Sequence, residues 1–72
     1  MSEEEVRPLQ KELIAVEGEL VLYEIKYNMS SEQFYHLWKK ASLPDTYEFN
    51  CWSMLYEGYM RLIDAINNNE VL

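Results

Sequence analysis

The stretch that decides the fold is residues 9–27, LQKELIAVEGELVLYEIKY. Its apolar residues recur at alternating steps of four and three, the heptad spacing of a helix that packs against another helix. This first stripe comprises Leu9, Leu13, Val16, Leu20, Tyr23 and Tyr27. A second stripe lies on nearly the opposite side of the same helix. It comprises Ile14, Gly18, Val21, Leu22 and Ile25.

Two apolar stripes predict a helix that is covered on two sides, because a helix on the surface of a single domain needs only one. Acidic residues fill the troughs between the stripes, with Glu17 and Glu24 in one and Glu12 and Glu19 in the other. We therefore expect the second stripe to be an interface, either with a second copy of the chain or with another protein. The sequence leaves open which stripe faces the rest of the chain.

Length and charge narrow the classes of function. A chain of 72 residues makes one small domain, which is marginally stable alone, and its 49% hydrophobic content excludes a disordered chain. Excess apolar surface on so small a domain favours an oligomer. The net charge of −7 opposes binding to nucleic acid by the chain itself and favours a basic protein partner.

The single cysteine, Cys51, excludes an internal disulfide and is typical of a reducing cytoplasm. The first residues, MSEEEVRP, are acidic and polar, unlike a signal peptide. No apolar run approaches the ~20 residues needed to span a bilayer. We expect a cytoplasmic protein without a membrane segment.

Three capping-box patterns divide the chain into helices. They are Ser2 with Glu5, Ser30 with Gln33, and Asp45 with Glu48. Pro44 should follow the end of the second helix, and the asparagines at 67–69 should end the third. We therefore predict helices at about residues 6–28, 31–41 and 46–67.

The two later helices each have an apolar face. On the short helix the face is Phe34, Leu37, Trp38 and Ala41, and on the third helix it is Phe49, Trp52, Tyr56, Tyr59, Ile63 and Ile66. A flanking line on the third helix is Cys51, Leu55, Gly58, Leu62 and Ala65, whose small members recur every seven residues and permit close helix packing. The predicted fold is all-α, with two long antiparallel helices joined by a short helix, dimerising into a helical bundle.

Candidate chemical sites are sparse. His36 has only Glu32 at helical spacing, too few ligands for a metal, and Cys51 has no histidine or basic neighbour to activate it. The inward Glu-x-x-His motif of di-iron bundles is missing. We expect no catalytic, cofactor-binding or metal-binding residues, and we predict that the protein is not an enzyme.

The break before the third helix has the length of a helix-turn-helix turn, but the helix after it carries a single basic residue, Arg61. DNA contact by this chain alone is therefore not expected. The tyrosines and tryptophans have the regular spacing of a helical core, although such residues also favour interfaces and could line a ligand pocket.

The middle of the chain resembles small acidic all-helical prokaryotic proteins, some of which are encoded beside toxin-like proteins and are regarded as antitoxins. The resemblance covers about residues 20–62. It lies in KYNMSSEQFY at 26–35, LPD at 43–45, FNCW at 49–52 and LY at 55–56. Asn28 stands where a glycine is usual, and asparagine also adopts left-handed conformations.

Two hypotheses of different classes follow. The first is a non-enzymatic protein–protein interaction module, a homodimer whose acidic surface binds a basic protein such as a toxin, as the resemblance implies. The second is a helical bundle that binds a small molecule in a pocket lined by tyrosine and tryptophan.

Overall fold

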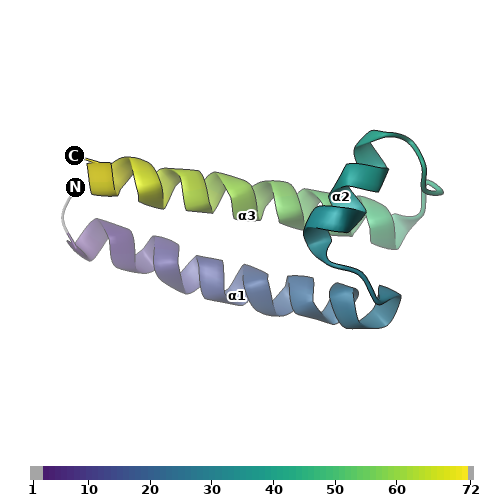
Figure 1. The fold of residues 1–72 in the computed structure, drawn as a ribbon. Helices are drawn as coiled ribbons and strands as arrows, with labels where there is room; N and C mark the ends of the chain where they lie inside the picture. Colours follow the sequence, from purple (N-terminus) through teal and green to yellow (C-terminus); the bar gives the residue numbers. More distant parts are fainter. Residues whose placement is uncertain (1–2, 72) are drawn as a thin grey trace.

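The computed structural model describes residues 3–71, and the side chains of residues 7–68. These residues form three helices, α1 (Glu3–Tyr27), α2 (Ser31–Lys39) and α3 (Tyr47–Val71). Figure 1 shows α1 and α3 side by side and antiparallel, with the start of α1 beside the end of α3 and α2 packed across the first half of α3. The predicted all-helical hairpin with a short connecting helix is confirmed.

The core is a cluster of aromatic rings at the end of the hairpin that α2 closes. Phe34 of α2 and Trp52 of α3 are fully buried and stack with centroids 3.9 Å apart. Tyr23 and Tyr27 of α1 stack on the same tryptophan, at 5.5 and 5.7 Å. Each aromatic ring buries a large apolar area, so these stacks supply much of the hydrophobic stabilisation and join all three helices.

The first stripe of α1 is the one that faces α3. Leu20 is buried in the aromatic cluster, and Val16 packs against the edge of the cluster. Towards the chain ends α1 is less covered, since Leu9 and Leu13 are only half-buried, although Ile66 of α3 is buried there at 8% exposure. The chain measures 42 × 21 × 17 Å, so most of its length is a single layer of two helices. A layer this thin cannot enclose a core on both of its faces.

Both connections begin with a residue in the left-handed conformation. Asn28 ends α1 with φ 54°, as its side chain allows, and Ala41 has φ 56° after α2. The N–H of Ser42 donates to the carbonyl of Leu37 at 3.0 Å, which completes a Schellman motif around Ala41. The prediction that the second helix continues to residue 41 was therefore wrong, since α2 ends at Lys39 and Ala41 is exposed in the turn.

The start of α3 differs from the sequence prediction by one residue. The hydroxyl of Thr46, not the carboxylate of Asp45, accepts the N–H of Phe49 at 3.1 Å and caps the helix. Glu48 is therefore one position away from the capping role expected for it. By contrast, the hydroxyl of Ser30 accepts the N–H of Gln33 at 3.0 Å, so the predicted cap of α2 is confirmed.

The outer ends of the two long helices also extend further than predicted. α3 runs through the asparagines to Val71, because asparagine disfavours a helix by less than 1 kcal/mol per residue and does not stop an established one. α1 begins at Glu3, so Pro8 lies inside it rather than in its first turn. The cap predicted at Ser2 lies outside the described residues.

Replacing Ala41 with glycine should raise the free energy of unfolding by about 1 kcal/mol, because glycine adopts the left-handed conformation without the clash of a Cβ. Denaturant unfolding followed by tryptophan fluorescence measures the change. The control is Ala15→Gly on the exposed side of α1, which should lower the free energy of unfolding by about 1 kcal/mol. A loss of stability in Ala41→Gly would contradict the assigned turn.

Candidate interaction surface

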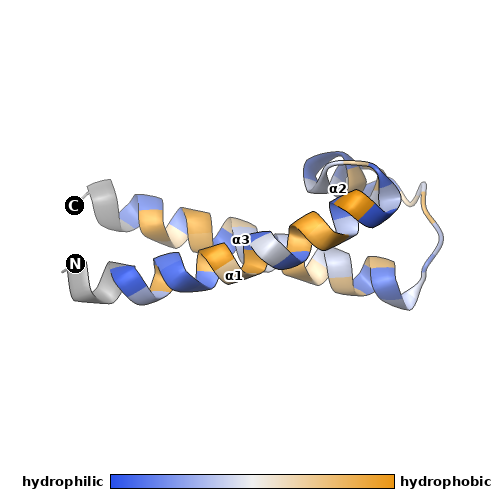
Figure 2. Ribbon diagram, turned by 90° about the horizontal axis from the view of Figure 1, so that it is seen from below, coloured by the Kyte–Doolittle hydropathy of each residue, from blue (hydrophilic) through white to orange (hydrophobic). Residues whose placement is uncertain are grey.

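The predicted interface residues lie on the outward face of α1, which we call the outer stripe (Ile14, Gly18, Val21, Leu22 and Ile25). Three of its side chains are about two-thirds or more exposed, Ile14 at 69%, Leu22 at 69% and Ile25 at 73%, and Val21 is 45% exposed. Figure 2, seen from below Figure 1, shows apolar residues along the middle of α1. No other part of the described chain covers this face. The hairpin therefore presents a row of large aliphatic side chains to solvent.

The outer stripe is smooth at its centre and acidic at its margins. A Cβ placed on Gly18 would meet no atom within 4 Å, so the position opens directly to the surroundings. Glu17 and Glu19 flank the stripe on its two sides, and both are exposed. An apolar row with carboxylates along its edges can hold a partner that is apolar at its centre and basic at its rim.

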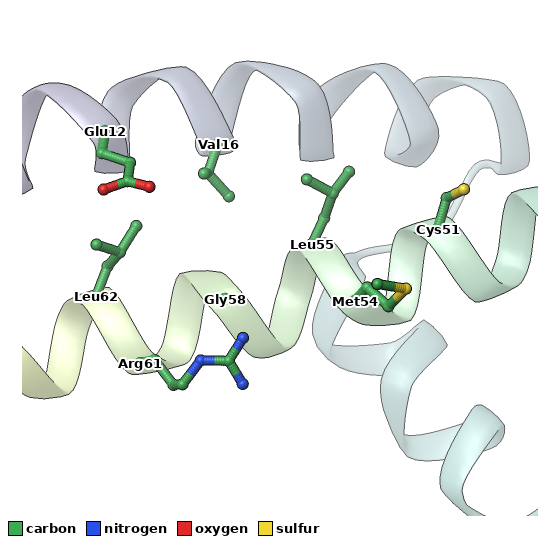
Figure 3. Close-up of a pocket in the computed structure, with 8 residues that line it drawn as sticks. All are labelled: Glu12, Val16, Cys51, Met54, Leu55, Gly58, Arg61 and Leu62. Atoms are coloured by element: carbon green, nitrogen blue, oxygen red, sulfur yellow. The ribbon is translucent and has the colours of Figure 1, made fainter.

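A second apolar surface, which we call the groove, runs between α1 and α3 (Figure 3). Its volume is about 590 Å³ and it is open along one face of the hairpin. Figure 3 shows Glu12 and Val16 reaching down from α1, Leu55, Leu62 and Cys51 pointing up from α3, and Arg61 lying along the α3 rim. The lining residues are Glu12, Val16, Cys51, Met54, Leu55, Gly58, Arg61 and Leu62.

The groove adjoins the outer stripe through Leu22, which lines the neighbouring depression together with Leu55 and Tyr23. Sequence reasoning did not predict the groove as a site. Its signal was the flanking line of the third helix, with Cys51 and Gly58 as small members, which was interpreted as packing within the chain. Glu12 and Arg61 line the same groove because of the register of α1 against α3. This register cannot be deduced from the spacing of residues within one helix.

A buried hydroxyl links the three helices beneath these surfaces. The side chain of Ser31, which is 3% exposed, accepts a hydrogen bond from the indole N–H of Trp52 at 2.9 Å. The hydroxyl and the backbone N–H of Ser31 both donate to Glu24 Oε2, at 2.7 and 3.0 Å. The carboxylate of Glu24 therefore lies at the N-terminus of α2, where the helix dipole favours negative charge.

A second polar junction joins α1 to the start of α3. Lys26 Nζ donates to both carboxylate oxygens of Glu48, at 2.6 and 2.8 Å, and the Tyr27 hydroxyl donates to Oε2 at 2.7 Å. The hydrogen bonds from Lys26 and Tyr27 lower the pKa of Glu48 below its ordinary value, and the same contact with Glu48 raises the pKa of Lys26. The pKa of Tyr27 is raised because its hydroxyl proton is held by the carboxylate.

The structure brings together no set of residues with an evident chemistry. Among the described residues, no group of three or more His, Cys, Asp or Glu side chains could hold a metal ion. His36 is exposed on α2, and Cys51 is a half-buried free thiol in the wall of the groove. The aromatic rings of the core stack on one another, and the groove between α1 and α3 is lined mainly by aliphatic residues.

No protein-family model, curated protein or solved structure matches this chain. Over the region that the structure covers, none of the helices has a segment long and apolar enough to pass through a membrane.

Replacing Ser31 with alanine should lower the free energy of unfolding by about 1–3 kcal/mol, because the buried indole N–H of Trp52 would lose its acceptor. Denaturant unfolding measures the loss, and the fluorescence of Trp52 should also change. The matched control is Ser42→Ala in the exposed turn, which should change the free energy of unfolding by less than about 0.5 kcal/mol. Equal free energies of unfolding for Ser31→Ala and Ser42→Ala would show that the buried hydroxyl of Ser31 does not stabilise the fold.

The junction at Glu48 predicts a defined pH dependence. Because the pKa of Glu48 is lower in the folded chain, the ionised carboxylate stabilises the fold above its ordinary pKa of 4.5. This contribution should disappear as the pH falls from 4.5 through the lowered value. The excess stability of the wild type over Glu48→Gln, measured by denaturant unfolding at pH 7, 4.5 and 3, should shrink stepwise. A difference that is constant with pH would contradict the lowered pKa.

Proposed function

We propose that this chain is a non-enzymatic protein–protein interaction module that self-associates and binds a basic protein partner. The observation that carries the proposal is the outer stripe, whose side chains Ile14, Leu22 and Ile25 are each at least two-thirds exposed. Burying one such side chain fully yields about 1.5–3 kcal/mol, so covering the row would offset a substantial part of the cost of association. Such a patch on a small protein is typical of a binding site.

The charge of the chain supports a basic partner. The net charge is −7, and the exposed carboxylates of Glu17 and Glu19 border the outer stripe directly. A basic partner would gain an increased rate of association from this field and a polar rim around an apolar centre. Proteins that cleave nucleic acids are basic where they approach phosphates, so an acidic helical protein suits the role of their inhibitor. The antitoxin-like role that the sequence resemblance implies is the specific form of this proposal.

The other proposed properties rest on the sequence. The cytoplasmic location is inferred from the single cysteine, which needs no oxidising compartment. The absence of enzymatic activity is inferred from the sequence, in which no nucleophilic side chain is accompanied by a residue that could act as its general base. The alternative, a bundle that binds a small molecule among its tyrosines and tryptophans, is less favoured because Phe34, Trp52 and Tyr23 fill the space between the helices with their own rings.

The direct test is coexpression with the protein encoded by the adjacent reading frame, followed by purification of a complex and measurement of growth. We expect a complex to form and, where the neighbour inhibits growth, the inhibition to be relieved. Ile25→Lys should weaken the complex by at least tenfold, because it places a charge within an apolar interface. Isothermal titration calorimetry with the purified proteins measures the dissociation constant.

The matched control is Ser42→Lys, which adds the same charge at an exposed position in the turn before α3. It should leave the dissociation constant within about twofold of the wild-type value. If Ile25→Lys and Ser42→Lys bind the neighbour equally well, the outer stripe is not the binding surface. If no complex forms and growth inhibition persists, the antitoxin-like role is wrong.

A further inference from the structure

We propose that the groove, not the outer stripe, is the surface through which two copies of the chain associate. The inference rests on the proposed self-association and assigns it to a particular face of the hairpin. It uses Leu22 at the edge of the outer stripe and leaves Ile14, Val21 and Ile25 free for a different partner. The argument depends on which groups line the groove and on their level along the hairpin.

The groove has unlike charges on its two walls. Glu12 projects from α1 and Arg61 lies on α3, and both line the same depression (Figure 3). Neither side chain makes a hydrogen bond or ion pair with another described residue. The guanidinium of Arg61 instead rests near Gly58, where an added Cβ would lie 3.9 Å from Nη2. Each wall therefore carries at its rim a solvent-exposed charge that no other described side chain pairs.

The two charges lie at nearly the same level along the hairpin. The helices are antiparallel, and Tyr23 of α1 stacks on Trp52 of α3. Counting back along α1 to Glu12 and forward by the same number of residues along α3 arrives within one helical turn of Arg61. A two-fold axis parallel to the helices preserves these levels. It places α3 of one copy across α1 of the other, antiparallel to it, with Arg61 facing the partner's Glu12 twice in the dimer.

The same operation covers apolar side chains that are now exposed. Met54, at 67% exposure, lines the groove, and Leu22, at 69%, lines the neighbouring depression. Counting from the stacked pair Tyr23 and Trp52 places the two side chains within one residue of the same level. In the two-fold arrangement Met54 of each copy packs against Leu22 of the other, beside the small residues Cys51 and Gly58. The result is a bundle of four long helices in which the groove face of each hairpin is covered, and the half-buried Leu62 becomes part of a core.

This arrangement fits a second copy better than an unrelated partner because the surface is complementary to itself. An unrelated basic protein would meet Arg61 as a like charge, whereas a second copy supplies a carboxylate there. The outer stripe shows the opposite pattern, with the acidic Glu17 and Glu19 beside it. The two surfaces therefore differ in the charge that they favour in a partner.

A charge-exchange experiment tests the inference. Glu12→Arg places two cations opposite each other in the dimer, and Arg61→Glu places two carboxylates opposite each other. Each variant should therefore associate at least about tenfold more weakly with itself than the wild type does. When the two variants are mixed, both contacts pair opposite charges again, and a heterodimer should form with an affinity near that of the wild type. Sedimentation equilibrium measures the association, and circular dichroism confirms that each variant is folded.

The matched controls are Ser42→Lys and Ser42→Glu, which change charge outside the groove and should self-associate within about twofold of the wild type. Single variants that dimerise like the wild type, or a mixture that stays monomeric, would overturn the groove as the interface. If Ile25→Lys abolishes the dimer and neither groove variant affects it, the interface is the outer stripe. The groove inference would then be wrong, while the proposed self-association would stand. A wild-type chain that is monomeric at all concentrations would overturn both proposals.

Discussion

The fold depends on the hydrogen bonds around the buried hydroxyl of Ser31. It accepts from Trp52 of α3 and donates to Glu24 of α1, while Ser31 itself is the first residue of α2. One serine thus fixes three helices with respect to one another at the point where their aromatic rings stack. An apolar residue there would leave the buried indole N–H without an acceptor, which is costly, and would leave Glu24 with only the backbone N–H of residue 31 from this junction. The stacks of Phe34 and Tyr23 on Trp52 provide the bulk of the packing, and the hydroxyl gives it a single geometry.

The concentration of the core at one end has a consequence for the rest of the hairpin. Beyond Leu20 towards the chain ends, α1 and α3 run as two helices without a third, and Leu9, Leu13 and Ile63 keep part of their surface in water. Two helices have only one line of mutual contact, so every additional apolar line on either helix remains exposed. The flanking line of α3 and the outer stripe of α1 are such lines. Their exposure follows from the architecture and does not require any local distortion.

The sequence predicted those features that depend on a single helix. The heptad spacing identified the two stripes, the cap at Ser30 was correct, and the tolerance of asparagine for φ > 0 anticipated Asn28. The same reasoning assigned the cap of α3 to Asp45 because Asp45 with Glu48 fits the capping pattern as well as any pair nearby. The structure uses Thr46, which places Glu48 where Lys26 and Tyr27 of α1 can reach it. The position of this cap goes together with contacts between helices, which a pattern of residues within one segment does not predict.

The groove was not predicted for the same physical reason. Glu12 and Arg61 lie far apart in sequence, and their common level appears only when the stacking of Tyr23 on Trp52 fixes the register of the hairpin. Once that register is known, each residue on the surface of α1 can be matched with the residue of α3 that lies at the same level along the hairpin. The outer stripe then differs from the groove, since the carboxylates of Glu17 and Glu19 border it, while Glu12 and Arg61 give the groove both signs of charge. In the arrangement that we propose, a thin hairpin with two such surfaces forms a symmetric bundle through the groove and still offers Ile14, Val21 and Ile25, on the outside of that bundle, to a basic protein.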